Sequence, residues 1–250
     1  MANSLSIRDL RFRYRAAEIG PGETGSTEER SGGFELAVSR LDLDEGEQLL
    51  LTGSSGGGKS TLLQIVAGLR DPDAGSVLVG GADIHALRGA ARDHFRGQRL
   101  GMIFQTFHLA QGFTALENVL LALLFGNPPK DRVPQDHRTR ARELLERLHI
   151  TRSNALVESL SVGQQQRVAV ARALACHPAL VLADEPTASL DPENADRAVD
   201  LLRTTCREQG AALLVVSHDP SLRGRFDRHV DLSSLAGAGT AAGTAIGGAA

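Results

Sequence analysis

Short apolar runs alternate with segments of helical periodicity along most of the chain, and turn residues separate them. Strands are expected at 5–14, 48–52, 77–79, 100–104, 180–183 and 212–216, and helices at 60–69, 114–125, 134–148, 163–176 and 192–209. Buried strands that alternate with helices indicate an α/β protein with a largely parallel sheet.

One predicted strand changes phase. Phe34, Leu36 and Val38 alternate with polar residues, and then Leu41 and Leu43 alternate one step out of register. Because successive side chains of a strand point to opposite faces, such a slip predicts a bulge or a bend.

Three segments depart from the general alternation. Residues 89–160 are mainly helical, which indicates a helical subdomain at about 106–165 within a single domain that spans 1–235. Residues 16–33 are rich in glycine and poor in apolar residues, so we expect a flexible surface loop there. Residues 236–250 form a low-complexity Gly/Ala tail that we expect to be disordered.

Composition narrows the class of protein. The formal net charge of −3 over 250 residues argues against a strongly basic nucleic-acid-binding protein, and no nucleic-acid partner is expected. Two cysteines cannot staple a chain of this length, and the N-terminus shows no secretory signal. The longest strongly apolar run, at 119–125, is far shorter than the ~20 residues of a membrane span. We expect an intracellular protein whose arginine-rich stretch at 138–147 is a solvated helix face.

The most informative segment connects the strand at 48–52 to the following helix. It contains, in order, Gly53, Ser54, Ser55, Gly56, Gly57, Gly58, Lys59 and Ser60, which fits G-x-x-x-x-G-K-[ST] in the strand-to-helix context of a phosphate-binding loop. Glycines let backbone N–H groups converge on an anion, and the helix N-terminus adds further donors. A Gly/Ser-rich turn is the alternative, but a chance match in a chain of this size is on the order of one per cent.

Two carboxylates close another apolar run. Asp184 and Glu185 end the strand predicted at 180–183, and in a parallel sheet they emerge at the same edge as the phosphate loop. Asp184 suits a hold on Mg²⁺, and Glu185 suits the orientation and deprotonation of a water that attacks a γ-phosphate. An isolated pair of this kind usually marks only a polar turn, so its meaning depends on the phosphate loop.

Four further stretches complete a recognisable order of motifs: Leu160 to Gln166 (LSVGQQQ), Gln105 after a strand, Ser189-Leu190-Asp191, and Val216-Ser217-His218-Asp219. Together with the phosphate loop and the two carboxylates, they make residues 5–232 resemble the nucleotide-binding subunit of ABC transporters, apart from the loop at 16–33. Local structural roles coexist with this resemblance: Ser161 and Gln164 also form a capping box, Asp191 before Pro192 starts a helix, and a histidine at a strand end is commonly structural.

The resemblance implies an ABC-type P-loop NTPase fold, with a mainly parallel core sheet, an antiparallel β subdomain and a helical subdomain. It implies ATP hydrolysis with Mg²⁺, in which Glu185, His218 and Lys59 are catalytic and Ser60, Gln105 and Asp184 attend the metal. The residues implied to contact ATP are Tyr14, Gly53, Ser54, Ser55, Gly56, Gly57, Gly58, Lys59, Ser60, Thr61, Gln105, Ser161, Gly163, Gln164 and Asp191. Ser161, Gly163 and Gln164 would reach the ATP of a second copy, in a head-to-tail homodimer formed on ATP binding.

Two positions qualify the match. Tyr14 is the aromatic that would stack on adenine, although the inserted loop follows it directly. Val162 stands where the family usually has the first glycine of LSGGQ. Because valine does not readily adopt a positive φ, we expect an ordinary helical or extended backbone at this position.

Residues 95–118 resemble the export-type branch that includes the lipoprotein-releasing and macrolide-export ATPases. This branch implies an integral membrane permease as partner, a periplasmic adaptor in the transport interpretation, and a location on the cytoplasmic face of a bacterial inner membrane. The alternative is a regulatory ABC ATPase that transmits force through a permease-like partner to a cell-envelope enzyme. Soluble relatives with paired cassettes or coiled-coil arms and GTPases fit less well, since the chain has no repeat, heptads or NKxD-type tetrapeptide.

Overall fold

The computed structural model describes residues 3–14, 34–131, 133, 136–188, 190 and 192–236. The predicted loop at 16–33, the tail beyond Ala236, and Ser189 and Asp191 therefore lie outside the described residues. None of the described helices has the length and apolarity that crossing a membrane requires.

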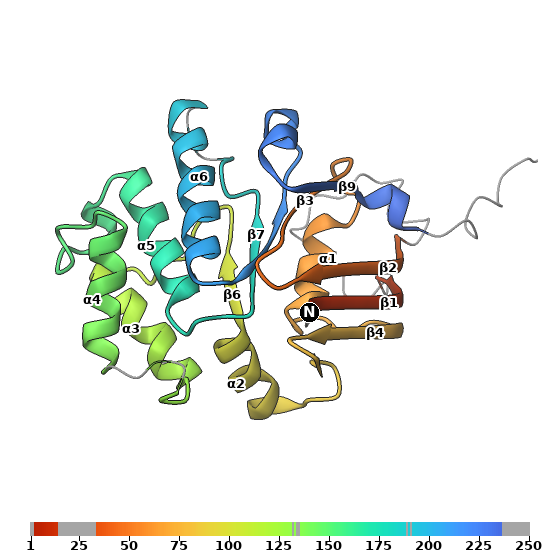
Figure 1. Cartoon of the computed structure of the whole chain (residues 1–250), viewed down its shortest axis with the longest axis horizontal. Coiled ribbons are helices and arrows are strands. Elements are labelled where there is room, and N and C mark those ends of the chain that lie inside the picture. The colour runs from red at the N-terminus through yellow and green to blue at the C-terminus, as the bar shows by residue number, and fades with distance from the viewer. Residues whose placement is uncertain are drawn as a thin grey trace, which may run out of the picture.

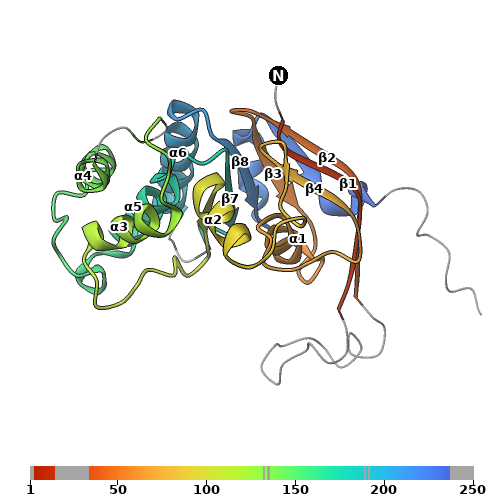
Figure 2. The same cartoon turned by 90° about the horizontal axis from the view of Figure 1, so that it is seen from below.

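An antiparallel sheet forms one end of the molecule (Figures 1 and 2). Its strands lie in the order β2 (Glu35–Asp44), β1 (Asn3–Arg13), β4 (Ala74–Val79) and β5 (Ala82–Asp83). The predicted change of phase is present in β2, and the neighbouring strand β1 changes phase with it. Asp9 of β1 has a φ of 47°, and the register of β1 against β4 shifts between Arg8 and Arg11. Because β1 and β2 keep one register here, their apolar residues change phase together and still face one core.

A second, fully parallel sheet lies at the centre of the molecule. Its order is β6 (Leu100–Ile103), β7 (Leu180–Asp184), β8 (Ala212–Val216), β3 (Gln48–Thr52) and β9 (Arg228–Asp231). Strands β3 and β8 are buried along their whole length, as expected for strands covered on both faces. The parallel sheet predicted from the alternation is thus confirmed, with helix α1 (Lys59–Val66) leading directly out of β3 by way of the glycine-rich loop.

Three helices gather at the end of the molecule opposite the antiparallel sheet: α3 (Ala115–Gly126), α4 (His137–Arg147) and α5 (Val162–Leu174). Their apolar faces share one core, which includes Leu123, Leu144 and Val170. Helix α6 (Pro192–Glu208) packs beside α5 and β8. A short 3-10 turn, η1 (Val157–Ser159), precedes α5, and η2 (Pro220–Arg225) and η3 (Leu232–Leu235) flank β9.

The expectation that the arginines at 138–147 form a solvent-exposed helix face is wrong for Arg140. Arg140 is 4% exposed, and its guanidinium donates to the carbonyl oxygens of Leu174 and Ala175 at 3.2 and 3.3 Å. It also donates to Oε1 of Gln209 at 3.1 Å. Its place is explained by the C-terminal carbonyls of α5, which have no partners within their own helix and accept hydrogen bonds from a charged donor.

Helix α2 (Gly89–Arg99) crosses the end of α3 at very close range. A Cβ on Gly126 would lie 2.6 Å from the carbonyl oxygen of Gly97 and 2.7 Å from Sγ of Cys176. The two backbones approach this closely only because both residues are glycines.

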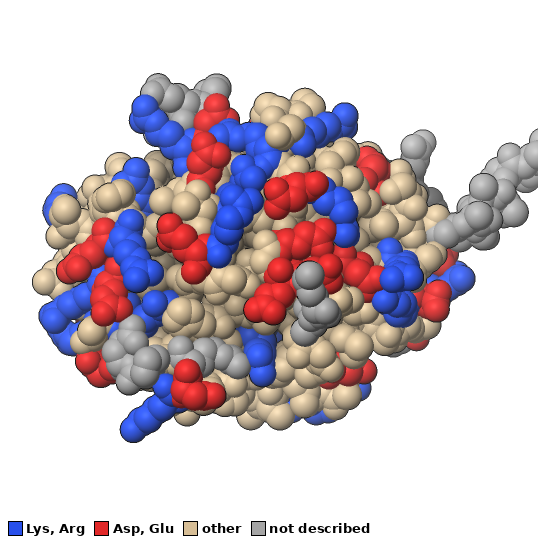
Figure 3. Space-filling model, viewed as in Figure 1, with Lys and Arg blue, Asp and Glu red and all other residues tan. Residues whose placement is uncertain are grey.

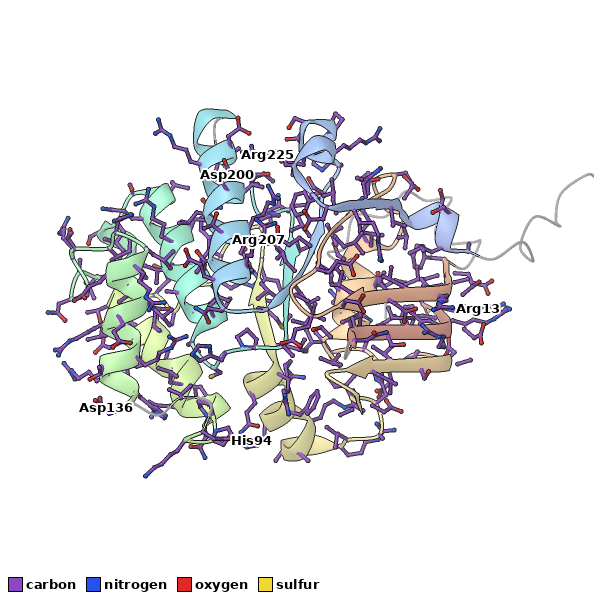
Figure 4. All side chains as sticks on the ribbon, viewed as in Figure 1. Arg13, His94, Asp136, Asp200, Arg207 and Arg225 are labelled. Atoms are coloured by element: carbon purple, nitrogen blue, oxygen red, sulfur yellow. The ribbon has the colours of Figure 1, made fainter. Side chains whose placement is uncertain are left out.

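Charged side chains of both signs are interspersed over the face seen in Figure 3, with acidic groups near its middle. Many are paired across elements. Figure 4 shows Arg225 reaching from η2 toward α6, where Asp200 lies, and their charged atoms are 2.6 Å apart. Asp196 pairs with the same guanidinium. These contacts tie the segment that follows β8 to the flank of α6.

Candidate functional site

The phosphate loop joins β3 to α1 in the strand–loop–helix context that the sequence predicts. Gly56 and Gly58 have φ values of 73° and 95°, in the left-handed region that glycine adopts without strain. Gly58 is the N-cap of α1, and no side chain caps the helix there. The first turn of α1 therefore presents backbone N–H donors, together with the positive end of the helix dipole, to an anion.

Lys59 lies over this loop. Its Nζ donates to the carbonyl oxygens of Gly53 and Ser54 at 3.0 and 2.9 Å. The ammonium group is thus held against the loop by two backbone carbonyls. A phosphate bound there would meet a cation that is already in position.

The hydroxyl of Ser60, the next residue of α1, donates to the carboxylate of Asp184 at the end of β7. Burial raises the pKa of Asp184; the hydrogen bond from Ser60 opposes this effect, and the neighbouring charge of Glu185 adds to it. Hydroxyl and carboxylate oxygens are the donor type that Mg²⁺ prefers. Ser60 and Asp184 together therefore fit a magnesium site beside the phosphate loop.

Glu185 is the most constrained residue of the site. It has a φ of 45°, which is uncommon for a residue with a side chain. Its Oε2 accepts a hydrogen bond from Ser217 at 2.9 Å, and its Oε1 accepts one from the backbone N–H of His218 at 3.0 Å. Nδ1 of His218 lies 2.7 Å from the same Oε1. Three groups from the end of β8 therefore fix one carboxylate, which can accept a proton from a water held beside it.

Sequence patterns did not single out Ser217. Its hydroxyl is fully buried and donates to Glu185. The signal was its place at the end of an apolar strand, directly before His218. Its Oγ also accepts a hydrogen bond from the backbone N–H of Asp219 at 3.1 Å, but its partner Glu185 follows a different strand, and only the fold identifies it.

Tyr14 lies at the end of β1, near the phosphate loop. Its hydroxyl is 3.1 Å from that of Thr61 on α1. Its ring meets Phe12 edge-on at 5.1 Å and Phe34 at 5.6 Å, and the guanidinium of Arg70 lies 4.9 Å from the ring centre. The structure thus places Tyr14, the residue predicted to stack on adenine, beside α1, the helix that follows the phosphate loop.

The segment 161–164 lies at the start of α5. This helix is on the side of the molecule that carries α3 and α4, whereas α1 and the phosphate loop are on the other side (Figure 1). Ser161 caps α5: its Oγ accepts from the N–H of Gln164, and the amide oxygen of Gln164 accepts from the N–H of Ser161. Val162 is the first helical residue, as expected for a side chain that avoids positive φ, and it is 49% exposed. Among the described residues, no hydrogen bond or ion pair joins this tip to the phosphate loop.

Gln105 lies on the exposed loop that connects β6 to α3. This loop starts at β6 in the core sheet and leads to α3 in the group of helices. The predicted site residues are therefore divided between two parts of the fold.

Comparison with known proteins identifies the family of this chain. The sequence model of the family described as "ABC transporter" matches residues 36–188. This chain is a member of the ABC transporter ATPase family. It is 44% identical over 194 residues to the lipoprotein-releasing system ATP-binding protein LolD 1 of Caulobacter vibrioides, covering 77% of this chain and 82% of that protein.

Solved ABC cassettes share the fold. A dimeric, post-hydrolysis structure of the cassette MJ0796 bound to ADP and Pi superposes with a TM-score of 0.71 at 31% identity, covering 91% of this chain and 93% of that chain. The cassette cbiO1 from Clostridium perfringens, part of the transporter complex cbiONQ, gives a TM-score of 0.69 at 26% identity over 88% of this chain and 80% of that one. As an ABC ATPase, this chain binds nucleotide and hydrolyses ATP as a transporter subunit.

Proposed function

We propose that the chain is the Mg²⁺-dependent ATPase subunit of an export-type or mechanotransmission ABC system, and that it powers a separate membrane permease from the cytoplasmic face of the membrane. The observation that carries this proposal is the set of polar and charged groups beside the phosphate loop. Ser60 and Asp184 offer oxygen ligands, and Glu185 is fixed by Ser217 and His218.

Each residue has a definable task in this proposal. The loop 53–60 holds the phosphates through backbone N–H groups, and Lys59 neutralises the β/γ-phosphate charge. Magnesium, when bound at Ser60 and Asp184, would further neutralise the phosphate oxygens. Glu185 accepts the proton of the attacking water, and His218 keeps the carboxylate aimed. Tyr14 and Thr61 take the nucleoside end, and Gln105 would contact the metal, when it is bound, and the attacking water.

The active unit in this proposal is a homodimer with two shared sites. Ser161, Gly163 and Gln164 lie on a tip that, among the described residues, has no hydrogen bond or ion pair to the phosphate loop of its own chain, and a Cβ at Gly163 would meet no atom within 4 Å. An open, capped helix N-terminus of this kind can receive a γ-phosphate from a second copy. The dimeric form of the related MJ0796 cassette supports this arrangement.

A groove between α2, β6, α3 and α5 is the proposed docking place for the permease. Its volume is about 460 Å³, and it is lined by Met102, Phe104, Ala122, Phe125 and others. Phe125 is 78% exposed and the adjacent Leu124 is 63% exposed. Such apolar exposure suits a short amphipathic helix from the cytoplasmic side of a permease, and the groove adjoins the loop that carries Gln105. The lipoprotein-releasing name of the Caulobacter relative supports the export-type branch.

The proposal is tested with Glu185→Gln, which keeps the size and removes the basic carboxylate. We expect ATP binding to persist while turnover falls by at least about a hundredfold, because general-base catalysis is worth ~10²–10⁴. Dimers trapped with ATP should then accumulate in size-exclusion chromatography. Glu146→Gln, an exposed change on α4, is the matched control. Unchanged single-turnover hydrolysis in Glu185→Gln would reject the assignment.

A further inference from the structure

The loop between β6 and α3 is held in a strained conformation. Phe107 and His108 are consecutive residues with φ values of 58° and 45°, although neither is glycine. Left-handed backbone of this kind persists only where the surroundings fix it. The side chain of Phe107 is buried, and the ring of His108 lies 4.7 Å from that of Phe104. These ring contacts provide no hydrogen-bond donors for the backbone carbonyl oxygens of Phe107 and His108.

Arg172, on α5, satisfies both carbonyls. Its Nη2 donates to the oxygen of Phe107 at 2.6 Å, and its Nη1 donates to the oxygen of His108 at 2.5 Å. Burial lowers the pKa of Arg172, and the residue is only partly exposed to water. Charge-assisted hydrogen bonds are strongest in such surroundings, and only the planar fork of an arginine reaches two successive carbonyls at once.

We propose that Arg172 is a positioning residue that fixes the Gln105 loop and joins it mechanically to α5. The inference rests on the proposed function in one respect, the placing of Gln105 at the metal and the water. Arg172 and His108, which form one of these two hydrogen bonds, also line the groove together with Phe104. A helix docked in the groove therefore acts directly on this contact.

The contact also reaches the tip of α5. Ser161 lies eleven residues before Arg172, about 16 Å along the helix at 1.5 Å per residue. Because the capping box orders the first turn and the helix is continuous, a shift of the loop at Arg172 moves the tip as part of one body. One side chain thus links the groove, the Gln105 loop and the residues that would face a second copy.

Hydrogen exchange of the nucleotide-free protein tests the link without any assumption about catalysis. In Arg172→Met, which keeps the apolar stem, we expect amides of residues 105–109 to exchange at least about tenfold faster than in the wild type, as for the loss of a contact that limits local opening. Arg172→Lys keeps the charge and one donor direction, so its exchange should be intermediate. Arg142→Met, exposed on α4, is the control for loss of an arginine.

Kinetics provide the second readout. We expect Arg172→Met to lower kcat by about tenfold to about a hundredfold while the KM for ATP changes little, because the loop misplaces Gln105 but leaves the phosphate loop intact. His108→Gly removes the cost of left-handed backbone at that position. In the double variant the kcat lost through Arg172→Met should therefore be smaller than in the single variant.

Unchanged exchange at 105–109 in both Arg172 variants would overturn the inference. So would a loss of activity that merely follows a lower melting temperature and is the same with or without His108→Gly. If Arg172→Met does not fold, Arg172→Lys decides the question by the same exchange measurement. A failure of the ATPase proposal would appear in Glu185→Gln and would leave the exchange result untouched.

Discussion

Asp184 and Glu185 are neighbours in sequence with different surroundings. Asp184 is the last residue of β7, whereas Glu185 follows the strand with a φ of 45°, so the backbone turns between the two carboxylates. Asp184 faces α1, where burial raises its pKa, whereas Glu185 faces the end of β8, where Ser217 and His218 surround it with donors. Two carboxyl groups of the same kind therefore suit different tasks because their surroundings differ.

The raised pKa of Asp184 predicts how magnesium binding depends on pH. Magnesium needs the carboxylate, and a carboxyl with a raised pKa takes up its proton at a higher pH than an ordinary aspartate. Affinity for Mg²⁺ in the presence of ATP should therefore be full at pH 8 and should begin to fall at a higher pH than an unperturbed aspartate allows. Isothermal titration between pH 8 and pH 5 measures this dependence.

Asp184→Asn is the control, since the nucleotide itself also titrates in this range. The variant should bind Mg²⁺ more weakly, and its remaining pH dependence should be that of the nucleotide. If wild type and variant show parallel curves, Asp184 does not contribute to the metal site.

Single residues divide into those that the sequence could assign and those that it could not. The strand–loop–helix conformation at 53–60 was predictable because its glycines and the start of α1 follow from local sequence. Arg140 and Arg172 were not, because a lone arginine in a helix looks like a solvent-exposed residue. Their partners are carbonyl groups of other segments, which no local pattern reveals.

At the scale of elements, the helices and strands with the most distinctive apolar patterns were the ones predicted from the sequence. Strands β3, β7 and β8 are almost wholly buried, so their composition is distinctive. Helix α2 has no buried residue, and β9 is a short strand of mostly half-exposed residues, so neither has a comparable signal. For that physical reason β9 was missed, and α2 was predicted only as part of the mainly helical region 89–160 and not as a separate helix. The slip in β2 was predicted correctly, but its cause lies equally in Asp9 of β1.

The crossing of α2 and α3 gives a prediction about stability. Gly126→Ala would place a Cβ 2.6 Å from the carbonyl oxygen of Gly97, so a backbone must move. We expect the free energy of unfolding to fall by about 1–3 kcal/mol, the usual cost of overpacking. Urea unfolding followed by circular dichroism measures the change.

Gly224→Ala is the matched control, because a Cβ there meets nothing within 4 Å. Its effect should stay within about 0.5 kcal/mol. An equally small effect of Gly126→Ala would show that the two helices separate readily.

At the scale of the whole molecule, the phosphate site and the α5 tip belong to different parts of one chain. Figure 1 shows α1 close to the antiparallel sheet and α5 among the helices of the opposite end. Sequence order could not establish this separation, because all the motifs follow one another along the chain. It follows from the three-dimensional course of the helices and is the physical reason to expect shared sites.

Mixed dimers test whether the sites are shared. Ser161→Arg and Glu185→Gln should each abolish turnover in a homodimer. A mixed dimer isolated with two different tags combines both defects in one site and leaves the other intact, so it should recover about half of the wild-type turnover. An inactive mixed dimer that still binds ATP at both sites would contradict this arrangement.

The capping box at Ser161 has a consequence for how two copies meet. The tip of α5 is folded and its first turn is fixed before any encounter. Little conformational entropy therefore remains to be lost there on association, in contrast to a loop that must fold against its partner. Formation of the pair should then be governed by the bound nucleotide and by collision of two rigid surfaces, and the exposed side chain of Val162 would be among the first atoms to lose water.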